Sequence, residues 1–528
     1  MTTTRRWLMH AAAAALSCCM SGQALAQETP VRGGSLSYAI EGGPDTLDCH
    51  AGATVTVLYF IAPHYSTLLK FDAAHYPEVT GDVAQSWDLS ADGKSITFKL
   101  HSDIKFHDGS TLDATDVAAS YERMRNPPAG VTSARKSLFD NIETIEVADP
   151  ATIKFTMKRP DAAILEIFAN PWNCIYSAEK LAEKPDYPAT EVMGSGPFKF
   201  VEYTPGARWK GERFDGYFRA GLPYLDRFEV VQVEGAGLMT ALAGKQVDAN
   251  FRMVTPPQQA QIKGVRGDEL VFPATESGTV VMGTLNHKFA PFADERVRRA
   301  LNIAIDRDAG LPAMKQQTIL SYISGAMRGE HKFGMPRSEL AKFPGFGGDI
   351  EQRRAEARAL LKEAGQENLK FTLLNRNVRT PYEPVGIFLI DQWRRIGVTA
   401  EMQLAETGEY FTRLRDGNYE AAVDYNAASG DDPNEVLLKY LPSSPSDFTH
   451  HEDPVLQELY DKQYVELDEA KRRALVQEFE ARVYSSNYNL HLFRGERAVA
   501  YPANLHGWHI TPSYYVGNDL AEVWWSPK

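Results

Sequence analysis

The sequence predicts a protein of mixed α/β class, folded into two or more lobes that each bury their own core. The chain has 528 residues, whereas one domain usually takes about 100–200. Its composition, with 43% hydrophobic and 24% charged residues, is that of a globular protein and excludes a disordered or fibrous chain. Segments with the two-residue period of strands also alternate with segments of helical spacing along the whole chain.

The individual elements follow from these periods. Alternating apolar and polar residues predict strands at residues 33–40, 96–100, 151–157, 199–203 and 227–231. Apolar residues at helical spacing predict helices at residues 54–69, 117–124, 294–305, 353–363 and 455–484. The last of these segments carries the helical pattern twice. The second half of the chain is therefore expected to be the more helical.

The first 26 residues have the features of a secretory signal peptide. Arg5 and Arg6 supply positive charge, residues 11–16 form the centre of an apolar stretch, and Ala24-Leu25-Ala26 is a small-residue cleavage site. The paired arginines fit a twin-arginine signal as well as a general secretory signal, so both export routes stay open. Either route predicts a mature protein that works in the periplasm.

The net charge, the lengths of the apolar runs and the cysteine content limit the class of protein further. A formal charge of −13 at pH 7 argues against binding to nucleic acid, because such proteins present a basic surface to the phosphates. No run of about 18 apolar residues follows the N-terminal segment, so no membrane span is expected in the body of the chain. Cys49 and Cys174 remain after the signal peptide. They can pair in an oxidising compartment, and the sequence leaves this open.

From residue 83 onward the chain carries a series of motifs in a fixed order. VAQSWDLSADGKSITFKL at 83–100 is followed by IKFHDGS at 104–110 and GSGPFKF at 194–200. Further blocks are FDGYF at 214–218, ALAGKQVD at 241–248, VRRAL at 297–301 and ALLKEAG at 359–365. The series closely resembles the family 5 (cluster C) extracellular solute-binding proteins of ABC importers, which include dipeptide-, oligopeptide- and nickel-binding proteins. The resemblance extends over essentially the whole mature chain.

The resemblance implies a two-lobe periplasmic-binding-protein fold of the Venus-flytrap type, in which hinge strands join lobes that close on a ligand. It also implies an additional α+β domain. Gly194 and Gly196 are expected to allow a tight backbone path where the chain crosses between lobes. The implied units are lobe I at residues 27–72, 190–278 and 500–528, the additional domain at 73–189, and lobe II at 279–499.

Asp431 and Asp432 are the first candidates for ligand contact. In dipeptide-binding relatives, an aspartate in a matching Gly-Asp-Pro segment holds the α-ammonium group of the ligand. The motif position makes Asp432 the counterpart and Asp431 its neighbour. A partly buried carboxylate needs a cationic partner, and a ligand ammonium group supplies one. An Asp-Pro pair is also typical of a helix N-terminus, so Asp432 is either a ligand-binding residue or a helix cap.

Four further residues are candidates for the same site. Tyr425 and Asn426 precede the aspartates, where several peptide-binding relatives have a tryptophan, and both can stack on or hydrogen-bond a ligand. Residues 41–47 follow the first strand at the place where relatives present lobe I to the ligand. Glu41 and Pro44 are therefore candidates, and a plain glycine-proline loop is the alternative.

The sequence contains no recognisable catalytic or metal-binding motif. Gly93-Lys94-Ser95 lacks the glycine that opens a phosphate-binding loop, and neither a Gly-x-Ser-x-Gly elbow nor a paired metal-ligand spacing occurs. We therefore expect no enzyme, no cofactor and no resident metal.

The expected function is that of a monomeric substrate-binding component of an ABC importer. It would capture a short peptide or similar organic solute between its lobes and deliver it to permease subunits in the inner membrane. Opines, oligosaccharides and metal chelates, which relatives also carry, stay open as ligands. A secreted hydrolase and a peptide-binding chaperone with the same fold are the alternative functions.

Overall fold

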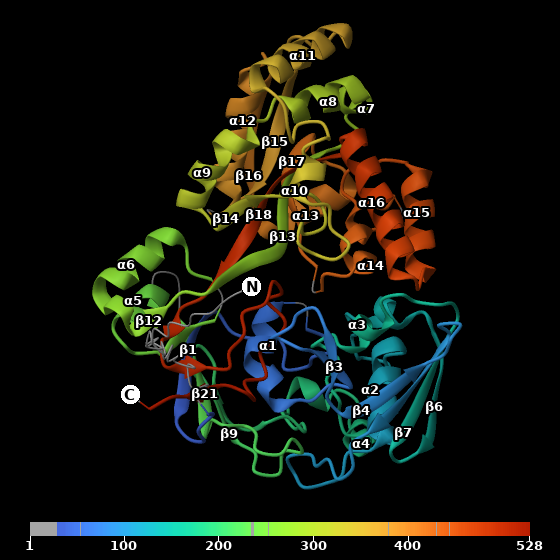
Figure 1. Ribbon diagram of the computed structural model, residues 1–528, viewed down its shortest axis with the longest axis vertical. Helices are drawn as coiled ribbons and strands as arrows, with labels where there is room; N and C mark the ends of the chain where they lie inside the picture. The colour runs from blue at the N-terminus through green and yellow to red at the C-terminus, as the bar shows by residue number, and fades with distance from the viewer. Residues whose placement is uncertain are drawn as a thin grey trace, which may run out of the picture.

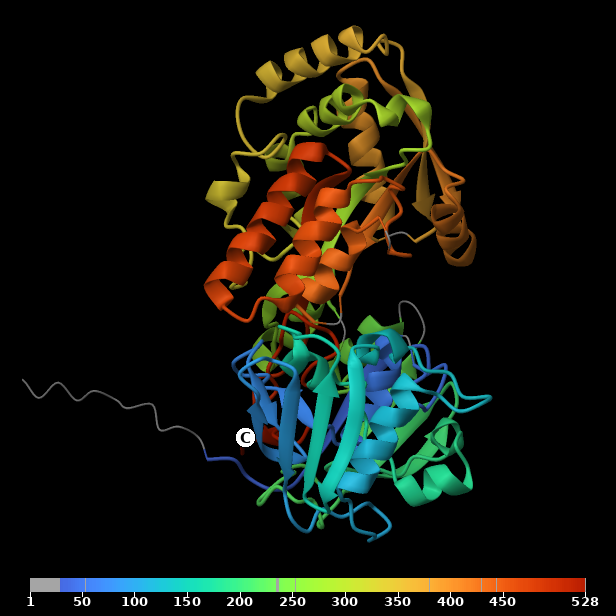
Figure 2. The ribbon, with the colours of Figure 1, turned by 90° about the vertical axis from the view of Figure 1, so that its right-hand side faces the viewer.

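The computed structural model describes residues 29–52, 54–233, 237–251, 253–378, 380–428, 430–442 and 444–527. Figures 1 and 2 show an upper and a lower body that meet near the middle of the molecule. The segment predicted as a signal peptide lies outside the described residues. Within them, no helix is long and apolar enough to cross a membrane.

The lower body contains a five-stranded sheet in the order β11-β1-β10-β9-β8. Strand β1 (Ser35–Glu41) lies between β10 (Arg227–Val233) and β11 (Ala249–Asn250) and runs parallel to both. The antiparallel strands β9 (Arg208–Arg213) and β8 (Phe198–Thr204) extend the sheet. Because β1, β10 and β11 are parallel, their carboxyl ends lie at one edge.

Beside this sheet lies a four-stranded antiparallel sheet in the order β4-β5-β7-β6. Its strands are β4 (Ala84–Leu89), β5 (Ser95–Leu100), β6 (Ile142–Asp149) and β7 (Thr152–Met157). Helix α2 (Ala114–Arg125) packs on it, with Tyr121 meeting Phe155 at 5.2 Å between ring centroids. The helix begins at a capping box in which Asp113 accepts from Thr115 N (2.6 Å) and donates its own N–H to Asp116 (2.8 Å).

The upper body contains a six-stranded mixed sheet in the order β14-β18-β13-β17-β15-β16. Strands β15, β16 and β17 are parallel to one another, whereas β13 runs antiparallel to β17. The strands are β13 (Ala274–Leu285), β14 (Leu320–Ile323), β15 (Lys370–Arg376), β16 (Thr399–Ala405), β17 (Ala421–Asn426) and β18 (Asn489–Ala498).

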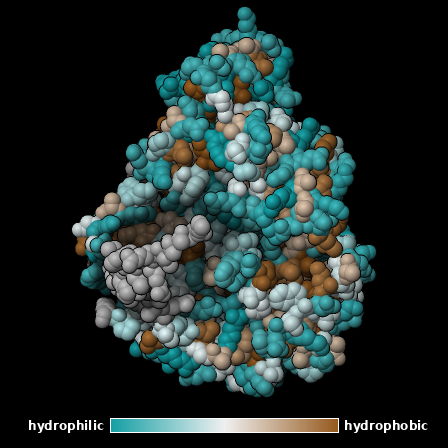
Figure 3. All heavy atoms as spheres, viewed as in Figure 1, coloured by the Kyte–Doolittle hydropathy of each residue, from teal (hydrophilic) through white to brown (hydrophobic). Residues whose placement is uncertain are grey.

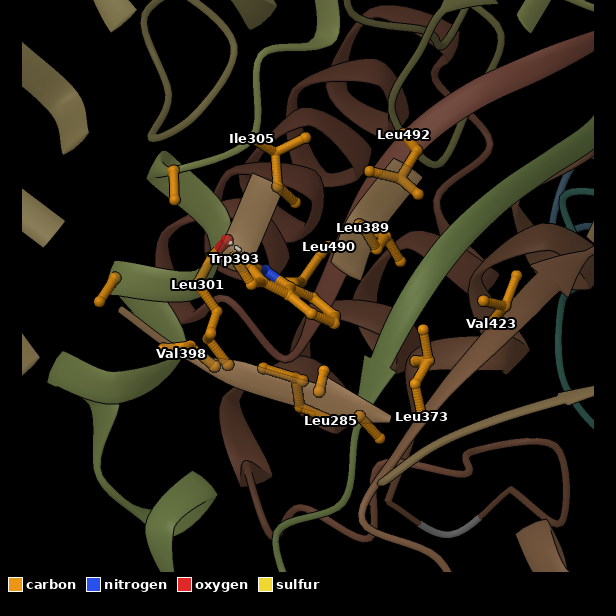
Figure 4. Close-up of a cluster of buried hydrophobic side chains, with 14 of the residues drawn as sticks. Leu285, Leu301, Ile305, Leu373, Leu389, Trp393, Val398, Val423, Leu490 and Leu492 are labelled. Carbon is orange, nitrogen blue, oxygen red and sulfur yellow. Dashed lines mark hydrogen bonds between the residues drawn. The ribbon is translucent and has the colours of Figure 1, made fainter. Parts of the chain in front are cut away.

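Helices cover both faces of this sheet. Trp393 lies at the centre of the larger core in Figure 4, between Leu301, Val398 and Leu490, and its indole N–H donates to the Leu301 carbonyl at 3.0 Å. Helices α8 (Glu295–Ile303), α9 (Arg307–Gln317), α11 (Ile350–Glu363) and α12 (Tyr382–Arg394) contribute to this core. The core on the other face includes residues of α14 (Pro433–Val436), α15 (Pro454–Val465) and α16 (Glu469–Ser486).

Two strands cross between the bodies. Below β13 and β18 the chain continues into β12 (Leu270–Val271) and β19 (Tyr501–Pro502), which pair with each other. Asn250 at the end of β11 donates its N–H to Ala500 O (2.8 Å) beside this crossing. The carboxyl edge of the lower sheet therefore lies at the hinge. Since β17 runs back toward the start of β13, the carboxyl edge of β15–β17 faces the lower body as well.

We call the part around the five-stranded sheet lobe I, the part around the four-stranded sheet and α2 the extra domain, and the part around the six-stranded sheet lobe II. The residue boundaries given above for these units remain a prediction.

The other helices of the lower body are α1 (Val55–Ile61), η1 (Ala62–His64), η2 (Lys136–Phe139), α3 (Ile164–Phe168), α4 (Ala178–Glu183), η3 (Tyr187–Ala189), α5 (Gly237–Ala243), α6 (Pro256–Arg266) and η4 (Gly267–Glu269). Those of lobe II are α7 (Ala290–Ala293), α10 (Arg337–Leu340), α13 (Thr407–Asp416) and η5 (Leu437–Tyr440). Short strand pairs are β2 (Leu69–Phe71) with β3 (Val79–Gly81) and β20 (Leu505–His506) with β21 (Trp524–Trp525).

The five predicted strands and four of the five predicted helices are present. The single helix predicted over residues 54–69 is wrong, because the chain forms α1, the short η1 and then strand β2. Pro63 lies in the first turn of η1, and a proline lacks the N–H that a continuing α-helix needs. The tight backbone path predicted at Gly194 and Gly196 is present, since a Cβ atom on either would overlap the backbone at His64, but it lies within the lower body and away from the strands that cross between the bodies.

A disulfide and a buried ion pair lie where lobe I meets the extra domain. Cys49 and Cys174 are bonded, with their Cα atoms 6.0 Å apart. Next to them, Arg123 of α2 donates to both oxygens of Asp48, at 2.6 Å from Nη2 to Oδ2 and 3.3 Å from Nη1 to Oδ1. Both charged side chains are almost fully buried. These links predict that lobe I and the extra domain move as one body.

Candidate ligand-binding site

The two carboxyl edges define where a ligand can be held. Glu41 ends β1 in the lower sheet, and Arg376 and Asn426 end β15 and β17 in the upper sheet. In open α/β sheets the crevice beyond the carboxyl ends of the strands is the usual ligand site. The segment at Pro512 contacts a crossing strand at the same place, where Gly278 of β13 donates its N–H to Pro512 O (3.1 Å).

Asp431 lies against this hinge, and one of its two carboxylate oxygens is bound by an arginine. Arg328 donates from Nε (3.0 Å) and Nη2 (2.7 Å), and both bonds go to Oδ2 of Asp431. The other oxygen, Oδ1, lies toward Gly278, so that a Cβ atom built on Gly278 would be 3.5 Å from it. Arg494 fixes this part of the hinge by donating to Gly278 O at 2.6 Å. One carboxylate oxygen of Asp431 is therefore oriented by a guanidinium while the other faces the hinge strand.

Asp432 is held differently. Its Oδ1 accepts from the N–H of Asn434 at 2.7 Å, which makes it the N-cap of α14. Arg472 of α16 donates to both of its oxygens, at 2.8 Å from Nη1 to Oδ2 and 2.6 Å from Nη2 to Oδ1. The cap described in the sequence analysis is thus present. Both oxygens of Asp432 are engaged by the protein, and its role in ligand binding remains a prediction.

Arg376, which sequence reasoning missed, forms a second polar centre at the lobe II edge. Its guanidinium lies over Tyr382 (4.7 Å), Phe411 (5.4 Å) and Tyr425 (5.8 Å). It donates to the hydroxyl oxygens of Tyr382 (2.9 Å) and Thr407 (3.2 Å). Within the described ranges, hydroxyl groups and rings rather than carboxylates contact Arg376. Tyr425, one of the predicted site residues, thus forms part of a cationic and aromatic cluster.

The structure gives less direct support for ligand contact by the remaining predicted residues, Asn426, Glu41 and Pro44. The side-chain amide of Asn426 donates to Val436 O at 2.9 Å and is mostly buried, so Asn426 ties β17 to α14. Glu41 is exposed at the end of β1, opposite Val233 of β10, and Pro44 is half-buried in the following loop. A contact of Glu41 or Pro44 with a ligand stays a prediction.

A cation of the extra domain also faces lobe II. The guanidinium of Arg135 lies 4.5 Å over the ring of Trp172 and donates to Gly52 O. Burial lowers the pKa of Arg135 to about 10, and the negative charge of Glu435 in α14 acts in the opposite direction. Opposite charges on the two sides attract, which favours approach of the extra domain and lobe II.

The histidines form no metal centre in the part of the chain that the structure describes, where no group of three His, Cys, Asp or Glu residues could hold an ion. His64 of η1 is fully buried. Its Nδ1 is 2.7 Å from Phe198 O, and its Nε2 accepts from Trp209 at 2.9 Å. Burial lowers its pKa to about 3, so the ring is a neutral part of the core.

The fold and this arrangement define a two-lobed solute-binding protein. The family described as bacterial extracellular solute-binding proteins, family 5 Middle, matches residues 78–448. The chain therefore belongs to this family, and the expected family and fold class are confirmed.

The chain is also similar in sequence to named relatives and in fold to solved structures. The glutathione-binding protein GsiB of Pectobacterium atrosepticum is 29% identical over 78% of this chain and 75% of its own length. The dipeptide-binding protein of Escherichia coli is 26% identical over 79% of this chain and 80% of its own. AgaA of A. tumefacien R10 in complex with agropinic acid has a TM-score of 0.77 at 24% identity, covering 94% of this chain and 99% of that one. DppA of Helicobacter pylori with the peptide STSA has a TM-score of 0.75 at 21% identity, covering 94% and 98%.

Proposed function

We propose that this protein is the periplasmic substrate-binding component of an ABC importer, which captures a short peptide or similar organic solute and delivers it to a membrane permease. The observation that carries the proposal is the pair of unlike charges offered by lobe II. Asp431 turns one carboxylate oxygen toward the hinge, and Arg376 presents a guanidinium without a described carboxylate partner at the sheet edge. A free peptide carries the complementary ammonium and carboxylate groups.

The ammonium end fits Asp431 better than Asp432. Both oxygens of Asp432 already accept from Arg472, and Oδ1 also caps α14. The Oδ1 atom of Asp431 is not used by Arg328, so it can accept a charge-assisted hydrogen bond from a ligand ammonium group. In this proposal Asp432 holds the segment in place while Asp431 contacts the ligand.

The carboxylate end fits Arg376. A guanidinium can donate two parallel hydrogen bonds to a carboxylate, and the surrounding rings restrict its orientation. The walls formed by Tyr382, Phe411 and Tyr425 can pack against apolar parts of a solute. The names of the relatives support a peptide-like ligand, because glutathione and dipeptides both carry an amino group and carboxylate groups.

Closure supplies the signal for transport. Two strands connect the bodies, and the segment at Pro512 contacts one of them, so a rotation about this hinge can bring lobe I toward lobe II. A ligand that contacts both lobes stabilises the closed state by its differential affinity for it. We propose that the permease recognises this closed state.

The test is a thermal-shift panel on mature protein that has been refolded to remove any bound ligand. It compares dipeptides and tripeptides that are free, N-acetylated or C-amidated, together with opine-like acids, oligosaccharides and nickel chelates. A ligand at 100 times its Kd stabilises the folded state by about 2.7 kcal/mol. We expect free peptides to raise the melting temperature more than either blocked form. If no peptide raises the melting temperature while another class of compound does, the peptide-like ligand is rejected and the family assignment is unaffected.

A further inference from the structure

The extra domain and lobe II touch at a second place, away from the hinge. Asp161 of the extra domain is 1% exposed and accepts from the side chains of Asn434 (3.0 Å) and Tyr464 (2.5 Å) of lobe II. The N–H of Ala162 donates to Tyr464 O at 2.9 Å. Since donors from α14 and α15 meet one buried carboxylate, these contacts form a defined junction. We call it the Asp161 junction.

Beside the Asp161 junction lies a cavity of about 600 Å³ between the two units. In Figure 3, apolar side chains gather on the side of the molecule where α14 lies above α3. A cavity of this size is ample for a small organic molecule. Much of its wall is apolar or aromatic and comes from both units, with Phe71, Leu138 and Ile167 from the lower body and Leu438, Tyr460 and Tyr464 from lobe II.

Glu166 of α3 is an uncompensated acid in this wall. Its Oε2 atom is buried and has no hydrogen-bond partner among the described residues. The charges that act on it are those of Asp431 and Asp432, which disfavour its ionised form, and those of Lys332 and Arg472, which favour it. Burial is the largest effect and raises the pKa of Glu166 well above its usual range.

The two nearby cationic side chains already pair with other carboxylates. Arg472 already binds both oxygens of Asp432. Lys332 is largely at the surface and pairs with Glu469 at 3.3 Å. Neither one forms an ion pair with Glu166, so burial keeps its carboxyl group in the neutral form until a cation is brought beside it.

We propose that this cavity is a second binding site, for an organic cation with an apolar body, whose ammonium group pairs with Glu166 while its body packs against Tyr460, Tyr464 and Leu438. The proposal does not rest on the peptide-like ligand proposed above. An ammonium group would supply the missing partner of Glu166 through a charge-assisted hydrogen bond. The tyrosine rings offer faces that attract cations as well as apolar groups.

The cavity is separated from the hinge site by the segment 430–436. Asp431 points from this segment toward Gly278 and Arg328, whereas Asp432 and Glu435 line the cavity. The lining includes four acidic residues, Asp140, Glu166, Asp432 and Glu435, against the two basic residues Lys158 and Arg159. The acids that line the cavity therefore favour a cation over an anion of the same shape.

The test compares three probes of one shape by titration calorimetry: tryptamine, the alcohol tryptophol and the acid indole-3-propionate. We expect tryptamine to bind at least about tenfold more tightly than either of the others, because only the amine can form the charged pair. The variant Glu166→Gln should lose this preference. Glu183→Gln, which changes an exposed glutamate on α4 of the same domain, should keep it.

A pH series gives a readout that an additional structural role of Glu166 would not change. Pairing with a cation ionises Glu166, so tryptamine should bind more tightly as pH rises from 5 to 8, and the dependence should be absent in Glu166→Gln. Equal binding of amine and alcohol, an unchanged preference in Glu166→Gln, or no binding of any probe at millimolar concentration would each overturn the proposal. Ile167→Trp, which fills the cavity while leaving Glu166 in place, should abolish tryptamine binding in a protein shown by its melting curve to be folded.

Discussion

Arg472 binds Asp432 with both of its terminal nitrogens, at 2.8 and 2.6 Å, across 40 residues of sequence. The two side chains are 5% and 6% exposed, so neither charge is solvated by water. Removing one partner from such a buried pair leaves the other charge without compensation. The helix cap at Asp432 and the loop that carries Asp431 thus depend on a residue of α16.

The first prediction concerns this pair. Arg472→Met should lower the free energy of unfolding by about 3–5 kcal/mol, because it leaves the carboxylate of Asp432 buried without a cation. Urea denaturation of both proteins measures the difference. The matched control is Arg473→Ala, whose surface pair with Glu469 spans 4.0 Å and should contribute less than about 1 kcal/mol. Equal losses in the two variants would contradict a structural role of the Asp432 pair.

The second prediction separates the neighbouring aspartates. Asp431→Asn should weaken binding of a free dipeptide by at least about tenfold, since the variant lacks the charge that would hold the ammonium group. Binding of the N-acetylated dipeptide should change little. Titration calorimetry with both peptides gives the ratio directly, and circular dichroism confirms that the variant is folded. If the ratio of free to acetylated affinity is the same as in the wild type, Asp431 does not bind the ammonium group.

The third prediction tests Arg376, which we propose binds the carboxylate group of the ligand. Arg376→Lys keeps the positive charge but removes the planar fork that binds a carboxylate in two places and stacks on rings. We expect it to lose about tenfold in affinity for a free dipeptide and much less for the C-amidated form. Arg395→Lys, at an exposed position on the same lobe, is the matched control and should bind like the wild type. Retention of full affinity in Arg376→Lys would show that charge alone is sufficient there.

Local patterns predicted the elements, but not the partners that make the site. The periods of apolar residues predicted strands and helices because each element must bury one face. The Asp-Pro pattern offered the cap as one of two roles for Asp432, because capping involves residues within one turn. Arg328 and Arg472 gave no comparable signal, since they lie 103 and 40 residues away from their partners and only the topology brings them together. The same holds for Arg376, whose rings come from separate elements.

The fourth prediction concerns the disulfide. Cys49 and Cys174 close a loop of 125 residues, and a cross-link over so long a loop strongly restricts the unfolded chain. The double variant Cys49→Ser/Cys174→Ser should lower the free energy of unfolding by about 2–5 kcal/mol. Guanidinium denaturation of the oxidised protein, the reduced protein and the double variant measures this. The reduced protein and the variant should agree; an unchanged midpoint in both would show that the bond adds no stability.

The last prediction is a pH dependence that arises from Glu480 of α16. This side chain is fully buried, its Oε1 accepts from the N–H of Met327 at 3.0 Å, and its Oε2 has no hydrogen-bond partner in the described part of the chain. Burial raises the pKa of Glu480 from 4.5 to about 7. The folded protein therefore binds a proton that the unfolded chain releases at lower pH. The contribution of this group is fully present below pH 4.5 and is lost as pH rises from about 4.5 to 7.

For Glu480 alone, the loss over this range is about 3 kcal/mol. Other groups titrate in the same range, so the difference between two proteins isolates the effect. Glu480→Gln keeps the shape and the acceptor for Met327 but cannot ionise. Relative to the wild type, the variant should gain stability as pH rises from about 4.5 to 7 and then level off in urea titrations. A difference between the two proteins that stays constant with pH would show that Glu480 does not change its protonation state on unfolding.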